Sequence, residues 1–479
     1  MQASITTPAG PGTALSRTVM WALLGLVLLA DALDMIDATV TTIAAPSIVG
    51  EIGGGPGLIK WLGAAYALAM AVLLVIGGRL GDRYGQRRLF LIGMTGFTLA
   101  SALCGLAPTP VVLVVARVLQ GAFGALLIPQ GMAIITRHFT PEMRRTAFNL
   151  FGPLLGIATI AGPVLAGFLI EADLAGLSWR PIFLVNLVLG TVGVALAARL
   201  LPRDNADRSV TVDGTGAGLL AIATFGAMFG LIEGSETDWG LPAVLSLVAG
   251  ALFLALFARR QRTAAEPLIK PSLFRNRGFV SGLTVGLMFF AVTNGLAFVL
   301  SLFVQQALGA SPGSAAVGML PLTLGIIVGA GAGMGLAARM GRALVLAGML
   351  VTLAGGGWLL ALVLTSGTSL TLLALAPAGV LAGIGMGACF GTIFDITIGD
   401  VAPAEAGSAS GTLTAVQQLA TALGSATVTT VYLHGGAPDH AMALAITTVM
   451  AVTALCLPLL RLLPKAAPRD AERSEPDAG

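Results

Sequence analysis

The chain has 479 residues, of which 56% are hydrophobic and only 10% are charged, whereas a soluble globular domain carries about 25% charged residues. So few charges cannot cover the surface of a soluble protein of this size, which excludes an ordinary cytosolic enzyme, a disordered chain and a nucleic-acid-binding protein. The composition predicts a polytopic membrane protein that has the lipid bilayer, and no nucleic acid, as a partner.

A helix needs about 20 mostly apolar residues to cross a bilayer, and fourteen segments of the chain meet that length. The predicted fold class is therefore an all-α integral membrane protein with fourteen transmembrane helices. The predicted spans cover residues 20–44, 58–78, 89–107, 111–136, 146–170, 180–200, 214–233, 241–258, 279–307, 313–337, 342–365, 370–398, 407–432 and 440–463.

The cations are distributed very unevenly around these spans. With fourteen spans, all but three of the 26 Lys and Arg residues fall on the side that holds both termini. Lys60 and Arg180 fall on the other side, and Arg117 lies inside a span. Because cytoplasmic loops are enriched in Lys and Arg, both termini are predicted to be cytoplasmic. A miscount by one span would destroy this asymmetry, which favours fourteen.

Two polar connections, 201–213 and 259–278, bracket the seventh and eighth spans and indicate an inserted pair of helices. A weak repeat of Leu, Arg and Gly between Leu80–Gly85 and Leu336–Gly341 agrees with two related halves, as in secondary transporters. The predicted organisation is a cytoplasmic tail (1–19), an N-terminal six-helix bundle (20–200), a linker with two inserted helices (201–278), a C-terminal six-helix bundle (279–463) and a cytoplasmic tail (464–479).

Three carboxylates fall within the first span, and each charge inside a bilayer is a candidate functional site. Asp31, Asp34 and Asp37 are spaced by three residues, so they share a slanting helix face about 120° wide and roughly 9 Å tall. Such a face cannot look at lipid, and close like charges disfavour full ionisation, so at least one Asp is expected to exchange a proton. Asp31 and Asp34 could instead only line a wet vestibule, or contact substrate.

Arg117 is the only cation inside a predicted span. Arg117 and Asp37 both lie about seven residues from the outer ends of their spans, which is roughly 10 Å deep in each case. Equal depth predicts an Asp37–Arg117 pair, with Asp34 as the other candidate partner. The pair could serve proton coupling, or it could be a static structural ion pair.

Other residues within spans admit two interpretations each. Asp395 could line the inner mouth or only extend to the interface. Gln120 and Asn294 could contact substrate or only bond between helices. Met288 and Phe289 could form an adaptable apolar wall for substrate, although core packing is the commoner role of such residues.

The sequence contains no catalytic or metal-binding constellation. Of the three His residues, His138 and His434 lie in predicted loops and His440 lies at the loop edge of the last predicted span, and no Walker loop is present. We therefore expect no enzyme activity, no metal site and no cofactor beyond the proton as coupling ion.

Residues Gly78–Arg88 between the second and third spans read GRLGDRYGQRR. This segment resembles the cytoplasmic loop motif of the major facilitator superfamily, with Gln86 where a basic residue is usual. The resemblance implies that the loop latches the cytoplasmic side when the protein is open outward, with Arg144 or Arg145 as the partner of Asp82. The implied latch residues are Gly78, Asp82, Arg83, Gly85, Arg87, Arg144 and Arg145.

Further segments resemble the fourteen-span drug:proton antiporter branch of that superfamily. Ile36–Val40 is similar to its signature in the first span, and Arg117–Gly121 to its fourth-span motif, in which the Arg takes part in proton transfer. Ala161–Gly167 is similar to its fifth-span motif, which implies that Gly162 and Pro163 bend the helix. Weaker matches are Trp179–Asn186, Leu273–Arg277, Ala406–Gly411 and Gln417–Gln418.

The resemblance implies a proton-coupled exporter of hydrophobic, drug-like small molecules, with cations favoured, working as a monomer in the inner (plasma) membrane. Asp34, Asp37 and Arg117 are the expected coupling residues. A transporter of a specific metabolite on the same fold, or a lipid-translocating protein, stays open. The expected substrate contacts are Asp31, Asp34, Gln120, Met288, Phe289, Asn294 and Asp395.

Overall fold

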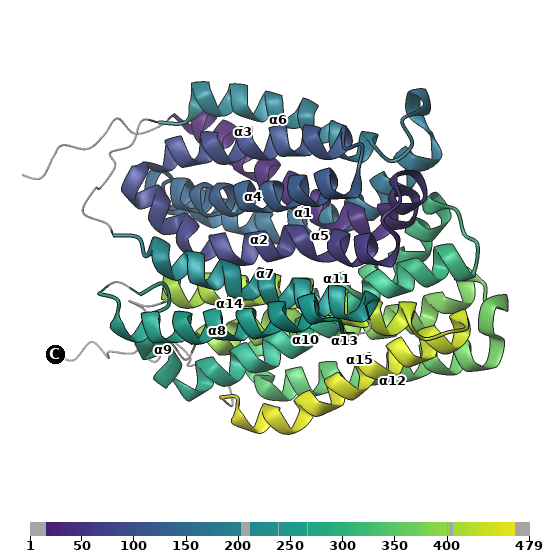
Figure 1. The fold of residues 1–479 in the computed structure, drawn as a ribbon. Coiled ribbons are helices and arrows are strands. Elements are labelled where there is room, and N and C mark those ends of the chain that lie inside the picture. Colours follow the sequence, from purple (N-terminus) through teal and green to yellow (C-terminus); the bar gives the residue numbers. More distant parts are fainter. Residues whose placement is uncertain are drawn as a thin grey trace, which may run out of the picture.

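The computed structural model is all-helical in the part of the chain that it describes (Figure 1). Fourteen of its helices have twenty or more residues, and each coincides with one predicted span. It describes residues 16–202, 211–237, 239–265, 267–399, 401 and 406–464. The long helices are α1 (Arg17–Ile52), α2 (Gly55–Tyr84), α3 (Gln86–Gly105), α4 (Pro110–His138), α5 (Pro141–Glu171), α6 (Pro181–Leu200), α7 (Gly214–Glu236), α8 (Leu241–Thr263), α10 (Arg277–Leu302), α11 (Pro312–Met340), α12 (Arg342–Ser366), α13 (Leu372–Gly399), α14 (Ala406–Leu433) and α15 (Pro438–Leu459).

Shorter helical pieces complete the chain. Helix α9 (Pro271–Arg275) precedes α10, and the π-helical segment η2 (Phe303–Ala307) continues it. Two 3-10 segments, η1 (Leu174–Gly176) and η3 (Gly367–Ser369), lie in connections, and η5 (Leu460–Leu462) follows α15.

Twelve helices of the described chain are long and apolar enough to cross a membrane. Helices α5 and α14 are not among them. Helix α5 contributes only the shorter apolar stretch Ala161–Glu171 to the residues whose side chains the structure describes, and α14 carries many hydroxyl and amide side chains. The count of fourteen spans therefore stays a prediction.

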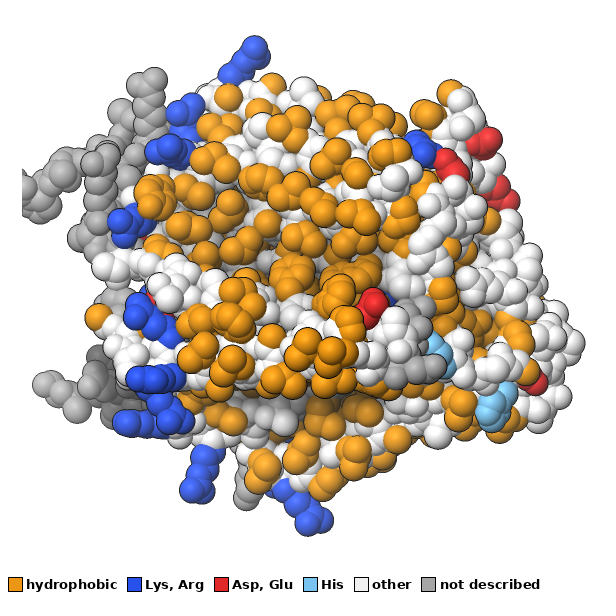
Figure 2. Space-filling model, in the orientation of Figure 1, with side chains coloured by type: hydrophobic (Ala, Val, Ile, Leu, Met, Phe, Trp, Pro, Cys, Tyr) orange, Lys and Arg blue, Asp and Glu red, His pale blue; other side chains and the backbone are white. Residues whose placement is uncertain are grey.

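Large apolar side chains cover the outside of the helices. Leu99 on α3, Val188 on α6 and Val248 on α8 are 60% to 65% exposed, and Figure 2 shows many hydrophobic side chains along the helices on the face that it displays. A surface of this kind is stable only against lipid, since its contact with water would cost about 25 cal/mol per Å². The chain is a multi-pass membrane protein.

Lys and Arg side chains gather at one end of the helices (Figure 2). This cation-rich end includes Arg17 at the start of α1, Arg83 in the last turn of α2 and Arg137 in the last turn of α4. The predicted cytoplasmic side corresponds to this end. The orientation in the membrane stays a prediction.

Helices α1–α6 pack mainly on one another, and so do α10–α15 (Figure 1). The two groups meet where α2 packs on α14 and where α5 packs on α11. Helices α7 and α8 form a pair, and α7 also contacts both α2 and α14. The predicted boundaries of two bundles and a two-helix linker are compatible with this packing and stay a prediction.

The two groups of helices are joined at the end opposite the cations. Ser301 Oγ near the end of α10 donates to the carbonyl oxygen of Thr42 on α1 at 2.7 Å. Gln305 Nε2 in η2 donates to the carbonyl oxygen of Ile43 at 3.1 Å. Val40 and Ile43 also belong to one apolar cluster with Phe298 and other buried residues of α10. This end of the molecule is closed between the two groups.

Candidate functional site

Helix α1 runs through the middle of the molecule, where it contacts α2, α4, α5, α6, α10 and α11. Its three carboxylates point inward, with Asp31, Asp34 and Asp37 being 7%, 4% and 0% exposed. The prediction that this face of α1 avoids lipid is therefore confirmed. Buried carboxylates need hydrogen-bond or charge partners, so the neighbours of each Asp define what the site can do.

Asp37 is the most completely partnered of the three. Its Oδ2 forms an ion pair with Nη1 of Arg117 on α4, as the equal depth of the two residues predicted. Its Oδ1 accepts a hydrogen bond from Nε2 of Gln120 at 2.7 Å and one from Nδ2 of Asn186 on α6 at 2.8 Å. Two helices, α4 and α6, thus converge on one fully buried carboxylate of α1.

Gln120 has its hydrogen-bonding capacity taken up by this network. Its amide nitrogen donates to Asp37 and to Ser101 Oγ on α3, each at 2.7 Å. Its oxygen accepts from Arg117 Nη1 at 2.8 Å and from Cys104 Sγ at 3.6 Å. An amide offers two donors and two acceptor sites, so Gln120 positions the ion pair here. Its predicted contact with substrate stays a prediction.

Arg117 is 1% exposed and is held between two aromatic rings. Its guanidinium carbon lies 4.5 Å from the ring centroid of Tyr66 on α2 and 5.8 Å from that of Phe183 on α6. Aromatic faces attract a desolvated cation, and a carboxylate partner offsets the large cost of burying its charge. Arg117 is therefore stabilised by one anion and two rings, and loss of the anion would leave a buried unpaired charge.

Tyr66 also donates its hydroxyl hydrogen bond to Oδ1 of Asp34. The close approach of α2 and α4 allows this contact, because a side chain at Gly121 would collide with the backbone carbonyl of Tyr66. A Cβ at Gly124 would lie 2.9 Å from Asp34 Oδ1. Sequence reasoning missed Tyr66, although a hydroxyl in the middle of an apolar span was a signal that could have found it.

Asp31 lies one helical turn from Asp34 toward the cation-rich end of α1. Its Oδ2 is buried and has no hydrogen-bond partner among the described residues. A carboxylate in such a position can accept a proton or a cationic group at low cost, since no existing contact has to break. Along α1 the carboxylates therefore change from fully partnered at Asp37 to largely free at Asp31.

The predicted substrate residues of α10 and α13 lie in the other group of helices. Phe289 is fully buried in the main apolar cluster, Met288 is partly buried beside it, and Asn294 donates to the carbonyl oxygen of Phe290 at 2.8 Å. Asp395 on α13 is exposed. The substrate contacts of these residues stay predictions, and for Phe289 the core-packing alternative describes its present position.

Two further aromatic residues, which sequence reasoning missed, extend this region. Phe390 and Phe394 are one turn apart on α13, and their ring centroids lie 6.0 Å from each other in a stacked arrangement. Phe290 of α10 approaches Phe390 with a centroid distance of 4.9 Å. Phe390 is 37% exposed, so the cluster offers an accessible aromatic face.

The predicted latch around the α2–α3 turn has a different partner from the one expected. Asp82 forms an ion pair with Arg137 of α4 at 2.6 Å, with both side chains about half exposed. In this structure Arg144 instead donates to the carbonyl oxygen of Phe139 at 3.5 Å, and its pairing with Asp82 in the outward-open state stays a prediction. The side chain of Arg145 lies outside the described residues. Because α2 and α4 belong to the same group of helices, the observed pair does not connect the two groups.

Four other residues of this motif also act within their own group of helices. Gly85 has a φ of 95°, which a glycine adopts without strain, and it ends α2 and begins α3. Arg87 Nη2 donates to the carbonyl oxygen of Ala198 on α6 at 2.7 Å, and Arg83 stacks over Tyr84 at 5.5 Å. Gly78 lies on α2, where a Cβ would be 4.0 Å from Pro129 of α4.

Gln86, which replaces a usual basic residue of this motif, lies next to Arg137. It is 1% exposed, and in the amide orientation that satisfies both groups its oxygen accepts from Arg137 at 3.0 Å. A basic side chain at this buried position would face the guanidinium directly. The neutral amide avoids that repulsion.

Gly162 allows α5 to touch α1 close to the carboxylates. A Cβ at this position would collide with Thr39 Oγ1 and lie 3.0 Å from the carbonyl oxygen of Ile36. Helix α5 is continuous through Gly162 and Pro163. The geometry gives Gly162 a packing role, and the predicted bending at these two residues stays a prediction.

Comparisons with known proteins identify relatives along most of the chain. A family model described as Major Facilitator Superfamily matches residues 27–425. A probable actinorhodin transporter of Streptomyces coelicolor is 42% identical over 436 residues, which are 89% of this chain and 74% of that protein. The puromycin resistance protein of Streptomyces alboniger is 37% identical over 422 residues, which are 86% of this chain and 81% of that protein.

Solved structures share the architecture. The crystal structure of a D-xylose–proton symporter matches with a TM-score of 0.65 and covers 93% of this chain and 98% of its own. Its sequence is 15% identical, so this likeness concerns the fold alone.

Proposed function

The chain belongs to the Major Facilitator Superfamily, and from that premise we propose that it is a proton-coupled exporter of hydrophobic, drug-like small molecules, with cations favoured. Relatives described as an antibiotic transporter and as an antibiotic resistance protein support export as the direction and antibiotics as the substrate class. Proton coupling and the preference for cations rest on the site in α1.

The buried network around Asp37 carries the proposal. A carboxylate, a guanidinium and two amides inside a membrane-spanning protein are costly to assemble, and burying an ion pair is weak evidence for a purely stabilising role. A site that must gain and lose a proton needs this arrangement, because the network can hold the ionised carboxylate and release it when a proton arrives.

Competition at the row of carboxylates couples the two fluxes. A cationic substrate is attracted by ionised Asp31 and Asp34, and a proton on either group removes that attraction. Substrate binding therefore favours proton release, and proton binding favours substrate release. For a neutral substrate, one proton that moves inward through 100 mV supplies about 2.3 kcal/mol, which corresponds to about a 50-fold concentration gradient. Exchange of one proton for one monovalent cation moves no net charge, so the pH gradient alone drives it.

Helix α1 connects the coupling site with the closed end of the molecule. Thr42 and Ile43, which accept the hydrogen bonds from Ser301 and Gln305, follow Asp37 by five and six residues on the same helix. At 1.5 Å per residue this separation is about 8 Å. We propose that a change in the partners of Asp37 shifts α1 and weakens these contacts, which opens the site to the opposite side of the membrane.

The remaining features of the proposal follow the predicted topology. We propose fourteen spans arranged as six, two and six, with both termini at the cation-rich cytoplasmic side of the inner membrane. The chain works as a monomer without a bound cofactor. In this arrangement the pair formed by α7 and α8 lies beside the contact between α2 and α14.

Everted membrane vesicles from an efflux-deficient host that expresses the chain provide the test. Drugs identified by a resistance screen are added to vesicles that hold an imposed acidic interior, which a trapped fluorescent dye reports. A transported drug is expected to release protons and restore the fluorescence. A drug to which the chain confers resistance, but which leaves the pH gradient untouched, would contradict antiport.

A further inference from the structure

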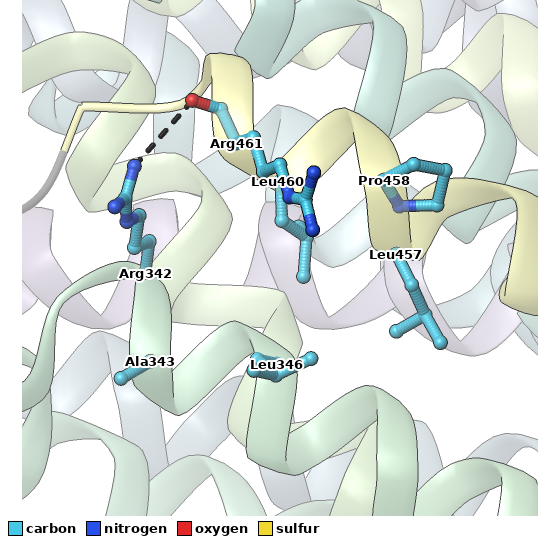
Figure 3. Close-up of a pocket in the computed structure, with 7 residues that line it drawn as sticks. All are labelled: Arg342, Ala343, Leu346, Leu457, Pro458, Leu460 and Arg461. Carbon is cyan, nitrogen blue, oxygen red and sulfur yellow. Dashed lines mark hydrogen bonds between the residues drawn. The ribbon is translucent and has the colours of Figure 1, made fainter.

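A second candidate binding site lies far from the carboxylates, at the cation-rich end of the second group of helices. A pocket of about 540 Å³ opens there between the start of α12 and the end of α15 (Figure 3). Neither helix carries a residue of the site described above. The pocket is lined by Arg342, Ala343, Leu346, Leu457, Pro458, Leu460 and Arg461.

Two arginines form the polar side of this pocket. Arg342 is the first residue of α12, and its Nη1 reaches across to the carbonyl oxygen of Arg461 at 3.4 Å (Figure 3). The same nitrogen lies 3.4 Å from the carbonyl oxygen of Leu463. Within the described part of the chain, neither guanidinium is paired with a carboxylate, since the ion pairs there involve other arginines. Two positive charges therefore share one opening without an anionic side chain from the described residues.

The other side of the pocket is apolar and faces the bilayer. Leu346 lies one helical turn into α12 from Arg342 and is 41% exposed. Leu457 and Pro458 on α15 provide the facing wall. Arg342 and Arg461 are close to the ends of two candidate membrane spans, Arg342–Ser369 and Pro438–Leu462, so the charges lie at head-group depth and the leucines at acyl-chain depth.

We propose that this pocket binds one anionic phospholipid, with the phosphate between Arg342 and Arg461 and an acyl chain along Leu346 and Leu457. Guanidinium groups match phosphate oxygens in shape and charge. Basic pockets between transmembrane helices on the cytoplasmic side suit anionic head groups. A free phosphate ion would use the arginines and leave the apolar wall without an occupant.

Lipid retention by the purified full-length chain tests the proposal. The protein in detergent is mixed with equal amounts of phosphatidylglycerol or phosphatidylcholine, and native mass spectrometry counts the bound lipids. Phosphatidylglycerol is expected to be retained in preference. Arg342→Gln and Arg461→Gln should each lower its retention about fivefold, as expected for one cation at an anionic surface. Arg262→Gln, which removes an exposed arginine of α8 at the same end, is the matched control and should retain the lipid fully.

Filling the apolar side separates a lipid from a free phosphate. Leu346→Trp leaves both arginines in place but occupies the acyl-chain path, so retention of phosphatidylglycerol should fall. Glycerol phosphate, which has the head group without acyl chains, should displace little phosphatidylglycerol from the pocket. Equal retention of both lipids, or unchanged retention in both arginine variants, would overturn the proposal. Retention that appears only after deletion of residues 465–479 would assign the pocket to the carboxylates of that tail instead.

Discussion

Arg117 of α4 and Asp37 of α1 form an ion pair across eighty residues of sequence, and neither side chain is more than 1% exposed. The pair connects the middle of the central helix with a helix that also contacts α2 through Tyr66. Since both charges are removed from solvent, a change in the protonation or partner of either one must be answered by movement of the other. Protonation at this ion pair is therefore expected to be linked to movement of α1 and α4.

Asp37→Asn is expected to abolish proton-driven efflux. The amide keeps the size of the carboxylate but cannot ionise, so a neutral substrate should lose the gradient of about 50-fold that one coupled proton supports at 100 mV. Substrate-induced fluorescence recovery in everted vesicles measures the loss. Protein yield and gel-filtration profile control for insertion and folding, and full efflux by this variant would remove Asp37 from the coupling site.

Arg117→Lys should fail to replace the arginine although the charge is kept. An ammonium group presents no planar fork to Asp37 and Gln120 and stacks less well on Tyr66. We expect weaker transport and a loss of stability of about 1 kcal/mol or more, measured by thermal unfolding in detergent. Wild-type transport and unfolding temperature in the lysine variant would show that charge alone suffices.

Tyr66→Phe and Tyr66→Leu separate the two contacts of this side chain. The phenylalanine keeps a ring over Arg117 and removes the hydrogen bond to Asp34, at a cost of about 1 to 3 kcal/mol for a buried acceptor left unsatisfied. The leucine removes both contacts and should impair transport and stability further. Comparison of efflux rates and unfolding temperatures tests this order. Identical behaviour of both variants would mean that the ring contributes nothing.

Asp82→Asn is expected to slow transport with little effect on stability. Its ion pair with Arg137 is about half exposed, and such pairs contribute less than about 1 kcal/mol. Arg137→Gln should reproduce the effect. Arg144→Gln is the matched control, because Arg144 lies at the same end without a contact to Asp82. A stronger transport defect in Arg144→Gln than in Arg137→Gln would restore the pairing predicted from the motif.

Gly162→Ala should destabilise the contact between α1 and α5. The added methyl group meets Thr39 and the carbonyl oxygen of Ile36, and overpacking of this kind costs about 1 to 3 kcal/mol. Gly25→Ala on α1 is the control, because nothing lies within 4 Å of its Cβ position. Thermal unfolding should show a decrease for the first variant and none for the second. Equal unfolding temperatures would indicate that α5 can move away at no cost.

Much of this architecture was accessible from the residues alone. Apolar length defined fourteen helices, because a bilayer imposes a nearly fixed span length. Equal depth predicted the Asp37–Arg117 pair, because two residues at the same level of antiparallel helices can meet. The prediction worked where one coordinate, depth along the membrane normal, was enough.

Only the tertiary structure determined which helices are neighbours, because depth along the membrane normal does not fix the position of a helix around the bundle. The site includes Tyr66, Ser101 and Asn186, which lie on three different helices. Their spacing in the sequence does not show that Tyr66 lies beside Asp34, or that Ser101 and Asn186 join the network of Asp37. Asp82 had several arginines within reach at the same level, and only the packing of α2 on α4 selected Arg137 over Arg144. Position around a helix bundle depends on long-range packing, in which small residues such as Gly121 set the distance between helices. The sequence by itself therefore determined the membrane class, the helices and the buried charges, and the fold determined their partners.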